Sequence, residues 1–201
     1  MNQLNISNLY DIEVNYANGL LPQRNDKNLF YSESSCRSDL SRFSLSSENR
    51  RILKNTDQFT YQLIPISQFN FDINTQKTCY QWIKLLGWNF PISSVKNIFT
   101  NHIFNYVYIW KLDQKIVAYS VSYFSKNISH IAYVFYDPQY SHTNLPIRLV
   151  LQNIIDSHQK NLKYCYLGRF SEQIGFYKRN MPGFQYFDNG QWLPYNKSKQ
   201  P

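Results

Sequence analysis

Glycine is scarce in this chain and unevenly placed. Only six glycines occur in 201 residues, and none lies between Gly87 and Gly168. Loops that wrap around a phosphate use glycine, because its missing Cβ lets backbone amides approach the anion closely. A glycine-rich phosphate loop is therefore excluded from the whole central part of the chain.

Cysteine and histidine are too few and too scattered for the common metal motifs. Cys36, Cys79 and Cys165 form no C-x-x-C pair, which excludes a zinc ribbon or a thioredoxin motif. The four histidines show no H-E-x-x-H or similar spacing, so we expect no metal site. Unpaired thiols and the lack of a signal-peptide pattern predict a cytosolic location. The longest apolar runs have strand length and contain polar residues, so no membrane span is expected.

Acidic residues are outnumbered by basic ones. The chain has 21 Lys and Arg against 13 Asp and Glu, a net charge of +8, and a pI of about 9.3. This sign favours polyanionic partners such as nucleic acid, anionic lipid or phosphorylated ligands, although a basic protein without such a partner fits equally well. The hydrophobic share of 43% is enough for a folded core, and 201 residues suit one domain with an N-terminal extension.

The first 57 residues are expected to form an extension packed on the core. Their one helical signal is a short basic segment that Ser46 or Ser47 can cap, within residues 34–56. A core over residues 58–195 follows, and a frayed tail over 196–201. The first core elements expected are a strand over 58–66 and helices over 73–87 and 91–101.

Alternating patterns then predict a run of three strands and a crossover. The expected elements are strands over 103–112, 115–124 and 128–136, a helix over 144–160 capped by Asn144, a strand over 162–168, a short helix or turn over 171–180 and a hairpin-like strand over 184–192. The fold class is therefore α+β with a mixed sheet, an antiparallel meander followed by a βαβ crossover. This is the element order of a GNAT-like acyltransferase core, in which two parallel strands separate and donor and acceptor meet in the gap.

The loop that enters the long helix argues against coenzyme A as the donor. An acetyl-CoA enzyme of this type would need a glycine-containing loop at the helix start, and residues 135–151 have no glycine. Pro146 removes one amide that could bind phosphate, and Asp137 adds a negative charge that would repel a pyrophosphate.

A set of short motifs resembles one known family. In order, the chain contains "FSLSSENRRILKNT" (43–56), "FYDP" (135–138), "NLP" (144–146), "YCYLG" (164–168), "YK" (177–178) and "GQW" (190–192). Together they resemble aminoacyl-tRNA–protein transferases, the arginyl and leucyl transferases of N-degron pathways. The resemblance implies transfer of arginine or leucine from aminoacyl-tRNA to the N-terminal α-amine of an acceptor protein, by a monomer without a cofactor. That family usually carries an N-terminal cysteine cluster, and this chain offers only Cys36 there.

The candidate site residues follow from the motifs. Asp137 and Tyr136 are the candidate catalytic residues; Asp137 would hold the donor ammonium or take a proton, unless it only forms an Asp-Pro turn. The candidate substrate-binding residues are Asn144, Tyr166, Leu167, Gly168, Lys178 and Arg179. Core packing is the alternative for both tyrosines, and helix capping for Asn144. Arg50, Arg51 and Lys54 are the candidate tRNA contacts, or else a solvated basic face.

Two other functions stay open from the sequence. An acyl-CoA-dependent N-acetyltransferase would share the fold but disagrees with the glycine-free loop. A non-catalytic tRNA- or RNA-binding relative would keep the basic cluster and lose the pocket.

Overall fold

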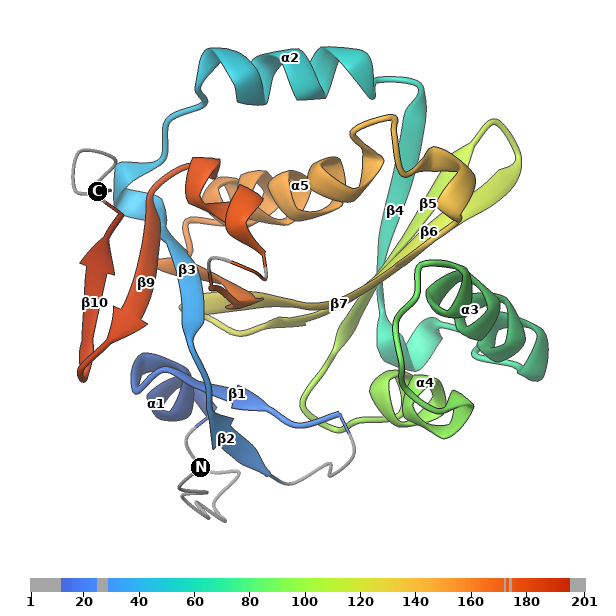
Figure 1. Cartoon of the computed structure of the whole chain (residues 1–201), viewed down its shortest axis with the longest axis horizontal. Helices are drawn as coiled ribbons and strands as arrows, with labels where there is room; N and C mark the ends of the chain where they lie inside the picture. Colours follow the sequence, from blue (N-terminus) through green and yellow to red (C-terminus); the bar gives the residue numbers. More distant parts are fainter. Residues whose placement is uncertain (1–11, 25–28, 172, 174, 196–201) are drawn as a thin grey trace.

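The computed structural model describes residues 12–24, 29–171, 173 and 175–195. Its main element is an eight-stranded mixed sheet in the order β10-β9-β3-β8-β7-β6-β5-β4 (Figure 1). Its strands are β3 (Ser35–Asp39), β4 (Phe59–Pro65), β5 (Tyr106–Leu112), β6 (Lys115–Phe124), β7 (Ile128–Tyr136), β8 (Tyr164–Arg169), β9 (Phe184–Asp188) and β10 (Gln191–Pro194). A separate two-stranded sheet pairs β1 (Leu20–Pro22) with β2 (Phe30–Ser32).

Helices cover both faces of the large sheet (Figure 1). The α-helices are α1 (Ile12–Ala17), α2 (Ser47–Asn55), α3 (Ile73–Leu85), α4 (Ile92–Phe99) and α5 (Leu145–Gln159), and the 3-10 helices are η2 (Leu40–Arg42), η3 (Ile66–Gln68), η4 (Pro138–Tyr140) and η5 (Phe176–Asn180). Helices α5 and α2 pack into one hydrophobic cluster with Trp110 and Val117, and α1, α3 and α4 pack into a second with Val107 and Val121. Alternate residues of β5 thus serve the two layers, as the period of a strand requires, while β6 changes phase at the register shift opposite Trp110 and Lys111.

The predicted meander and crossover are confirmed. Strands β4 to β7 pair antiparallel in sequence order, and β7 pairs parallel with β8 after the long helix α5. The parallel register is short: Ile128 faces Tyr164, Ser129 faces Cys165 and His130 faces Tyr166. Beyond His130 the two strands separate, which creates the gap that the GNAT-like order predicts.

Strand β3 was not expected from the sequence. It lies inside the large sheet between β8 and β9, so the segment before residue 57 supplies part of the sheet and does more than cover it. The segment lacks the alternation of apolar and polar residues typical of a strand, because its buried side chains are largely polar. Arg37 illustrates the reason: its Nε donates to Gln185 at 2.8 Å, and its guanidinium lies over the rings of Tyr164 and Trp192.

Both helix starts singled out in the sequence are helix starts, but only one is capped by a side chain. Ser46 and Asn49 form a reciprocal capping box at the start of α2. Asn144 occupies the N-cap position of α5 with a left-handed φ of 63°, and its side chain makes no capping hydrogen bond. The expected side-chain cap of α5 is therefore wrong, because the left-handed backbone does not direct the amide at the first turn.

Candidate active site

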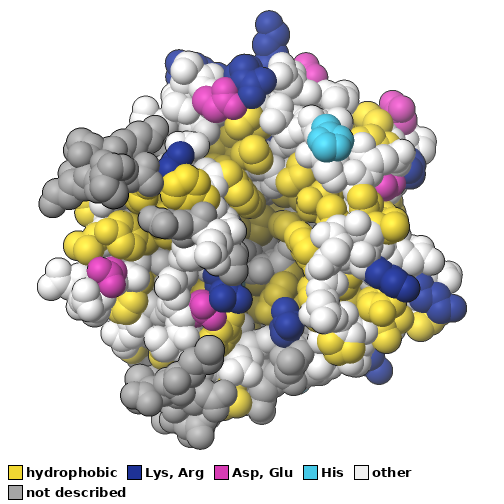
Figure 2. All heavy atoms as spheres, viewed as in Figure 1, with side chains coloured by type: hydrophobic (Ala, Val, Ile, Leu, Met, Phe, Trp, Pro, Cys, Tyr) yellow, Lys and Arg dark blue, Asp and Glu magenta, His cyan; other side chains and the backbone are white. Residues whose placement is uncertain are grey.

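A cavity of about 860 Å³ opens where β7 and β8 separate. Its walls come from β7, from the end of β8, from Gly175 to Lys178, from the loop after α3 and from the segment around β1 and β2. Figure 2 shows this face of the molecule hollowed at its centre, with hydrophobic side chains in the hollow and charged side chains at its rim. The size suits a small ligand or the reacting end of a larger one.

The separation of the strands is marked by a glycine. Gly168, two residues after the last paired position of β8, has a φ of 79°, which favours glycine. A Cβ at this position would lie 3.8 Å from His130 Nε2 and 3.8 Å from Lys178 Nζ. The glycine thus leaves open the space between these two side chains.

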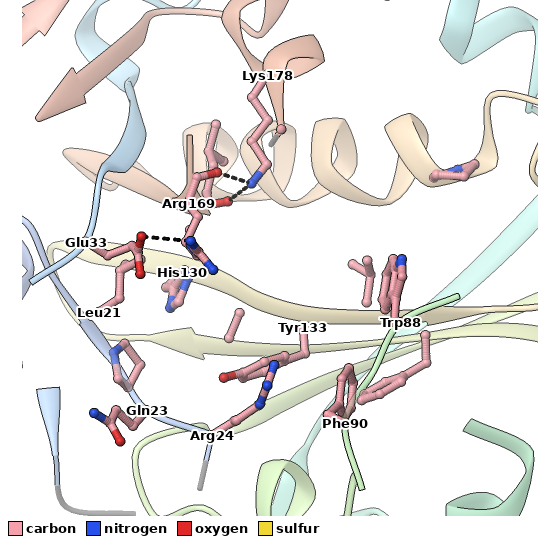
Figure 3. A pocket seen from close by; sticks show the side chains of 18 of the residues that line it. Leu21, Gln23, Arg24, Glu33, Trp88, Phe90, His130, Tyr133, Arg169 and Lys178 are labelled. Atoms are coloured by element: carbon pink, nitrogen blue, oxygen red, sulfur yellow. Dashed lines mark hydrogen bonds and ion pairs between the residues drawn. The ribbon is translucent and has the colours of Figure 1, made fainter. Parts of the chain in front are cut away.

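The Lys178 ammonium is fixed by the backbone of β8 (Figure 3). Its Nζ donates to the carbonyl oxygens of Leu167 at 2.6 Å and Arg169 at 2.9 Å. An ammonium has three N–H donors, so one remains for a ligand. Burial lowers the pKa of Lys178 below its usual value, and the nearby Arg169 cation lowers it further.

His130 lies at the last paired position of β7 and lines the cavity. Its Nδ1 is 2.7 Å from the hydroxyl of Tyr16, while its buried Nε2 has no hydrogen-bond partner among the described residues. Burial and the Lys178 cation lower the pKa of His130 to about 3. The imidazole is therefore neutral at physiological pH.

Charged and aromatic side chains surround the rest of the cavity (Figure 3). Glu33 and Arg169 form an ion pair of 2.9 Å, and the Arg24 guanidinium lies 4.8 Å from the ring centre of Phe90. Together with Lys178, the two arginines give the lining three cations against one described carboxylate, which favours an anionic ligand group at the rim.

Four of the predicted site residues meet at this cavity. Tyr136, Leu167, Gly168 and Lys178 all line it, although they come from β7, β8 and η5. The sequence motifs that carry them therefore converge in space.

The other predicted substrate-binding residues lie off the lining. Tyr166 is buried, and its hydroxyl accepts from Arg37 at 3.4 Å. Arg179 turns away, with its guanidinium over Phe176 and a hydrogen bond to the hydroxyl of Tyr195. Asn144 is also absent from the lining, so its ligand role stays a prediction without a contact to support it.

Asp137 occupies a turn beside the cavity. Its carboxylate accepts from Lys115 Nζ at 3.0 Å and from the backbone and side chain of Gln139. It caps η4 and is not among the residues that line the cavity. These contacts are those of an Asp-Pro turn, and a catalytic role for Asp137 stays a prediction.

The loop between β7 and α5 uses its amides internally. The N–H groups of Gln139, Tyr140, Ser141 and Thr143 all donate to acceptors within residues 137–140. Amides engaged in this way are not free to surround a pyrophosphate. This supports the sequence argument from missing glycines.

The basic helix α2 carries the predicted tRNA contacts. Arg51 forms an ion pair with Glu48, in which both side chains are 52% exposed, and Arg50 donates to the carbonyl oxygen of Leu45. Lys54 lies in the last turn of the same helix. None of the three lines the cavity, so a tRNA role would need a surface that extends to α2.

Cys36, Cys79 and Cys165 are free and buried, and within the described part of the chain no group of three His, Cys, Asp or Glu side chains could hold a metal. Among the described helices, none combines the length and apolar character needed to cross a bilayer.

Sequence reasoning missed several cavity residues. His130 stands alone in a strand, and its partner Tyr16, which lies behind the lining, is 114 positions before it. Arg24 and Glu33 belong to no motif, and Arg169 only follows the "YCYLG" motif. Nothing local marks them, because only the fold brings them to one place.

The model of the family described as arginine-tRNA-protein transferase, C terminus, matches residues 49–188. The chain belongs to this transferase family. The match includes β7, α5, β8 and η5, and therefore most of the cavity wall. No curated protein matches the chain in sequence.

Solved structures agree on the fold. The C-terminal DUF2156 domain of a predicted lysylphosphatidylglycerol synthetase from Agrobacterium fabrum has 16% identity and a TM-score of 0.51, and a conserved protein of unknown function from Bacteroides thetaiotaomicron has 11% and 0.51. Each comparison covers 77% of this chain and 58% of the other, so this chain spans little more than half the length of either. An aminoglycoside acetyltransferase from a soil metagenome has 14% identity and a TM-score of 0.43, over 63% of this chain and 89% of the other. The two matches with a TM-score of 0.51 support the α+β fold with a mixed sheet that the strand pairing shows.

Proposed function

We propose that this protein transfers an amino acid from aminoacyl-tRNA to the N-terminal α-amine of an acceptor protein. The observation that carries the proposal is the cavity at the divergence of β7 and β8, in a chain of the arginine-tRNA-protein transferase family. The aminoacyl ester would enter the cavity, and aminoacyl-tRNA would be a co-substrate with no further cofactor.

The cations of the cavity suit this donor. Arg24 and Arg169 stand at the rim, where they could meet phosphates near the 3′ end of the tRNA. The aromatic side chains of Trp88 and Tyr133 offer flat surfaces on which a base could stack. Neither kind of contact depends on the identity of the base, which suits a 3′ end that all tRNAs share.

The reaction needs positioning more than a strong base. A neutral acceptor α-amine, whose pKa is about 8 in free peptides, attacks the ester carbonyl carbon. The C–N bond forms, the carbonyl electron pair moves to oxygen, and collapse breaks the bond to the ribose oxygen, which takes the proton that the amine loses. The remaining N–H of Lys178 would stabilise the negative oxygen of the intermediate.

The alternative donor, acyl-CoA, is less well supported. The loop before α5 has no glycine, its amides at Gln139, Tyr140, Ser141 and Thr143 are already bonded, and Pro146 lacks one. An acyl group esterified to tRNA needs no pyrophosphate cradle there. We infer a monomer that acts in the cytoplasm, where both substrates are present.

One assay separates the donors. The protein is incubated with labelled Arg-tRNA, Leu-tRNA or acetyl-CoA and with peptides that begin with Asp, Glu, Arg or Lys. Label transferred from an aminoacyl-tRNA to an unblocked peptide, and not to its N-acetylated counterpart, is the expected result. Label from acetyl-CoA alone would refute the proposal, and tight tRNA binding without transfer would favour the non-catalytic relative.

A further inference from the structure

We propose that His130, held by Tyr16, is a second hydrogen-bond donor to the reacting carbonyl oxygen. This inference rests on the proposed function and adds a catalytic residue to it. The position lies across the Gly168 gap from Lys178, at the point where β7 and β8 separate.

The first observation is an unsatisfied buried nitrogen. His130 is 3% exposed, and its Nε2 has no partner among the described residues although it lines the cavity. Leaving a buried polar group unpaired costs about 1–3 kcal/mol, so such groups are uncommon in folded proteins. A ligand oxygen in the cavity would supply the missing partner.

The second observation fixes which nitrogen carries the proton. Tyr16 is fully buried, and the Nδ1 of His130 is the partner of its hydroxyl among the described residues. If the hydroxyl donates to Nδ1, its own hydrogen is satisfied and the ring proton must sit on Nε2. The other tautomer would leave both the Tyr16 hydrogen and the Nε2 lone pair without partners. Tyr16 therefore turns His130 into a donor toward the cavity.

A donor role also fits the environment better than a base role. Burial and the Lys178 cation oppose a positive charge on His130, so the ring accepts a proton poorly. A neutral imidazole can still donate its N–H to a developing oxyanion, and it needs no protonation step to do so. The base that accepts the amine proton must then be the leaving ribose oxygen, directly or through water.

Both donors border the space beside Gly168. His130 Nε2 and Lys178 Nζ each lie 3.8 Å from the position that a Cβ of residue 168 would occupy. A carbonyl oxygen near that point can approach both, and the charge it gains in the tetrahedral intermediate strengthens both bonds. The aminoacyl carbonyl is the group expected there.

Two substitutions at His130 separate the donor role from a structural one. His130→Gln places an amide N–H near the former Nε2 and gives up the bond to Tyr16, whereas His130→Asn places its amide near the former Nδ1 and gives up the cavity donor. We expect His130→Gln to keep kcat within about tenfold and His130→Asn to lose about 10²- to 10³-fold, with KM little changed in both. Circular dichroism and thermal unfolding report whether each variant folds.

Nuclear magnetic resonance gives a readout that does not depend on turnover. In the ¹⁵N-histidine-labelled wild type, His130 is expected as the Nε2–H tautomer. Its Nε2–H signal is expected to shift on addition of 3′-leucylamido- or 3′-arginylamido-3′-deoxyadenosine, whose amide carbonyl replaces the ester. The matched Tyr16→Phe variant should show a mixture of tautomers.

The outcomes distinguish this inference from the proposed function. An Nδ1–H tautomer, an Nε2–H signal that neither analogue shifts, or a His130→Asn variant more active than His130→Gln overturns the donor role while transfer itself stands. No transfer by the wild type, with the tautomer and the analogue shift as expected, refutes the proposed reaction and keeps the carbonyl-oxygen site.

Discussion

Lys178 Nζ donates to the carbonyl oxygen of Leu167 at 2.6 Å, and so ties η5 to the end of β8 at the edge of the cavity. The same ammonium bonds Arg169 O at 2.9 Å. The lysine therefore has two separable roles, one in joining two chain segments and one in presenting its third N–H to a ligand. Each role predicts a different consequence of substitution.

Lys178→Gln should lose about 10²- to 10³-fold in kcat, the usual effect of removing one oxyanion donor. The unpaired carbonyl groups of Leu167 and Arg169 should also lower the free energy of unfolding by about 1–3 kcal/mol. Single-turnover transfer is measured well below the unfolding midpoint, so that the two effects separate. The neighbouring Arg179→Gln is the control, since Arg179 contacts Phe176 and Tyr195 and not the cavity. Equal losses in both variants would count against a chemical role for Lys178.

Gly168→Ala should abolish most transfer, because its Cβ would stand 3.8 Å from both proposed donors and fill the space for the carbonyl oxygen. Its φ of 79° also makes any side chain costly, by about 1–2 kcal/mol. Gly190→Ala is a matched control: it has a φ of 78° and no atom near its Cβ position. Both variants should lose a similar amount of stability, as measured by thermal unfolding, but only Gly168→Ala should lose kcat in steady-state transfer.

Asp137→Asn tests the sequence-based assignment directly. Because Asp137 is off the cavity lining and paired with Lys115, we expect turnover to change little. A tenfold or larger loss of kcat at unchanged tRNA affinity would instead support the catalytic role that the "FYDP" motif predicts. Transfer kinetics and tRNA binding are measured on the same preparation.

The same residue predicts an acid dependence of stability. Burial alone would raise the pKa of the Asp137 carboxyl, but hydrogen bonds from Lys115 and Gln139 bring it below its ordinary value. A carboxyl group whose pKa is depressed in the folded state stabilises the protein at pH values above its unfolded-state pKa of about 3.9. This stabilisation is lost as the pH falls through the folded-state pKa. The free energy of unfolding of the wild type should exceed that of Asp137→Asn by about 0.5–1 kcal/mol at pH 7, and this difference should shrink below about pH 4. A pH-independent difference in urea midpoints would contradict this.

The sequence predicted what depends on local pattern. The meander and the β7-α5-β8 crossover follow from period-two alternation and from the apolar stripe of Ile147, Leu151 and Ile154, and these patterns need no distant partner. Strand β3 was missed because Arg37 and Ser38 are buried by contacts with β8, β9 and Pro182, none of which is visible within "SCRSD".

The site was only half predictable for the same reason. Tyr136, Gly168 and Lys178 sit in motifs, and the cavity confirms that these motifs lie together. His130 has the sequence context of an ordinary strand residue, because its hydrogen-bond partner Tyr16 lies in a segment 114 positions away. Asp137 belongs to the "FYDP" motif, but its carboxylate bonds Lys115 and Gln139 in a turn. A position within a motif therefore does not by itself show that a side chain reaches the cavity.

The thiols should be unreactive in the folded protein. Burial raises the pKa of both Cys36 and Cys165 to about 12, even though Lys178 lowers that of Cys36. Both thiols therefore stay protonated at pH 8, and the thiolate is the form that reacts. Iodoacetamide should leave the native chain unmodified and its transfer activity intact, while the urea-unfolded chain should take up three labels. Rapid labelling of Cys36, whose Sγ lies 3.4 Å from the carbonyl oxygen of Gly168, would show that the cavity wall near Gly168 opens.

The basic side chains of α2 test how far a tRNA surface extends from the cavity. If phosphates extend from the Arg24 and Arg169 rim to α2, the Arg50→Ala/Arg51→Ala double variant should weaken tRNA binding and reduce the magnitude of its salt slope by about 2. Since Arg51 is paired with Glu48, Glu48→Ala should instead tighten binding at low salt by freeing that cation. The control is Lys77→Ala/Lys84→Ala on α3, which removes the same charge from exposed positions on the opposite layer. An unchanged slope in the α2 variant, or an equal change in the α3 variant, would confine the tRNA contacts to the rim of the cavity.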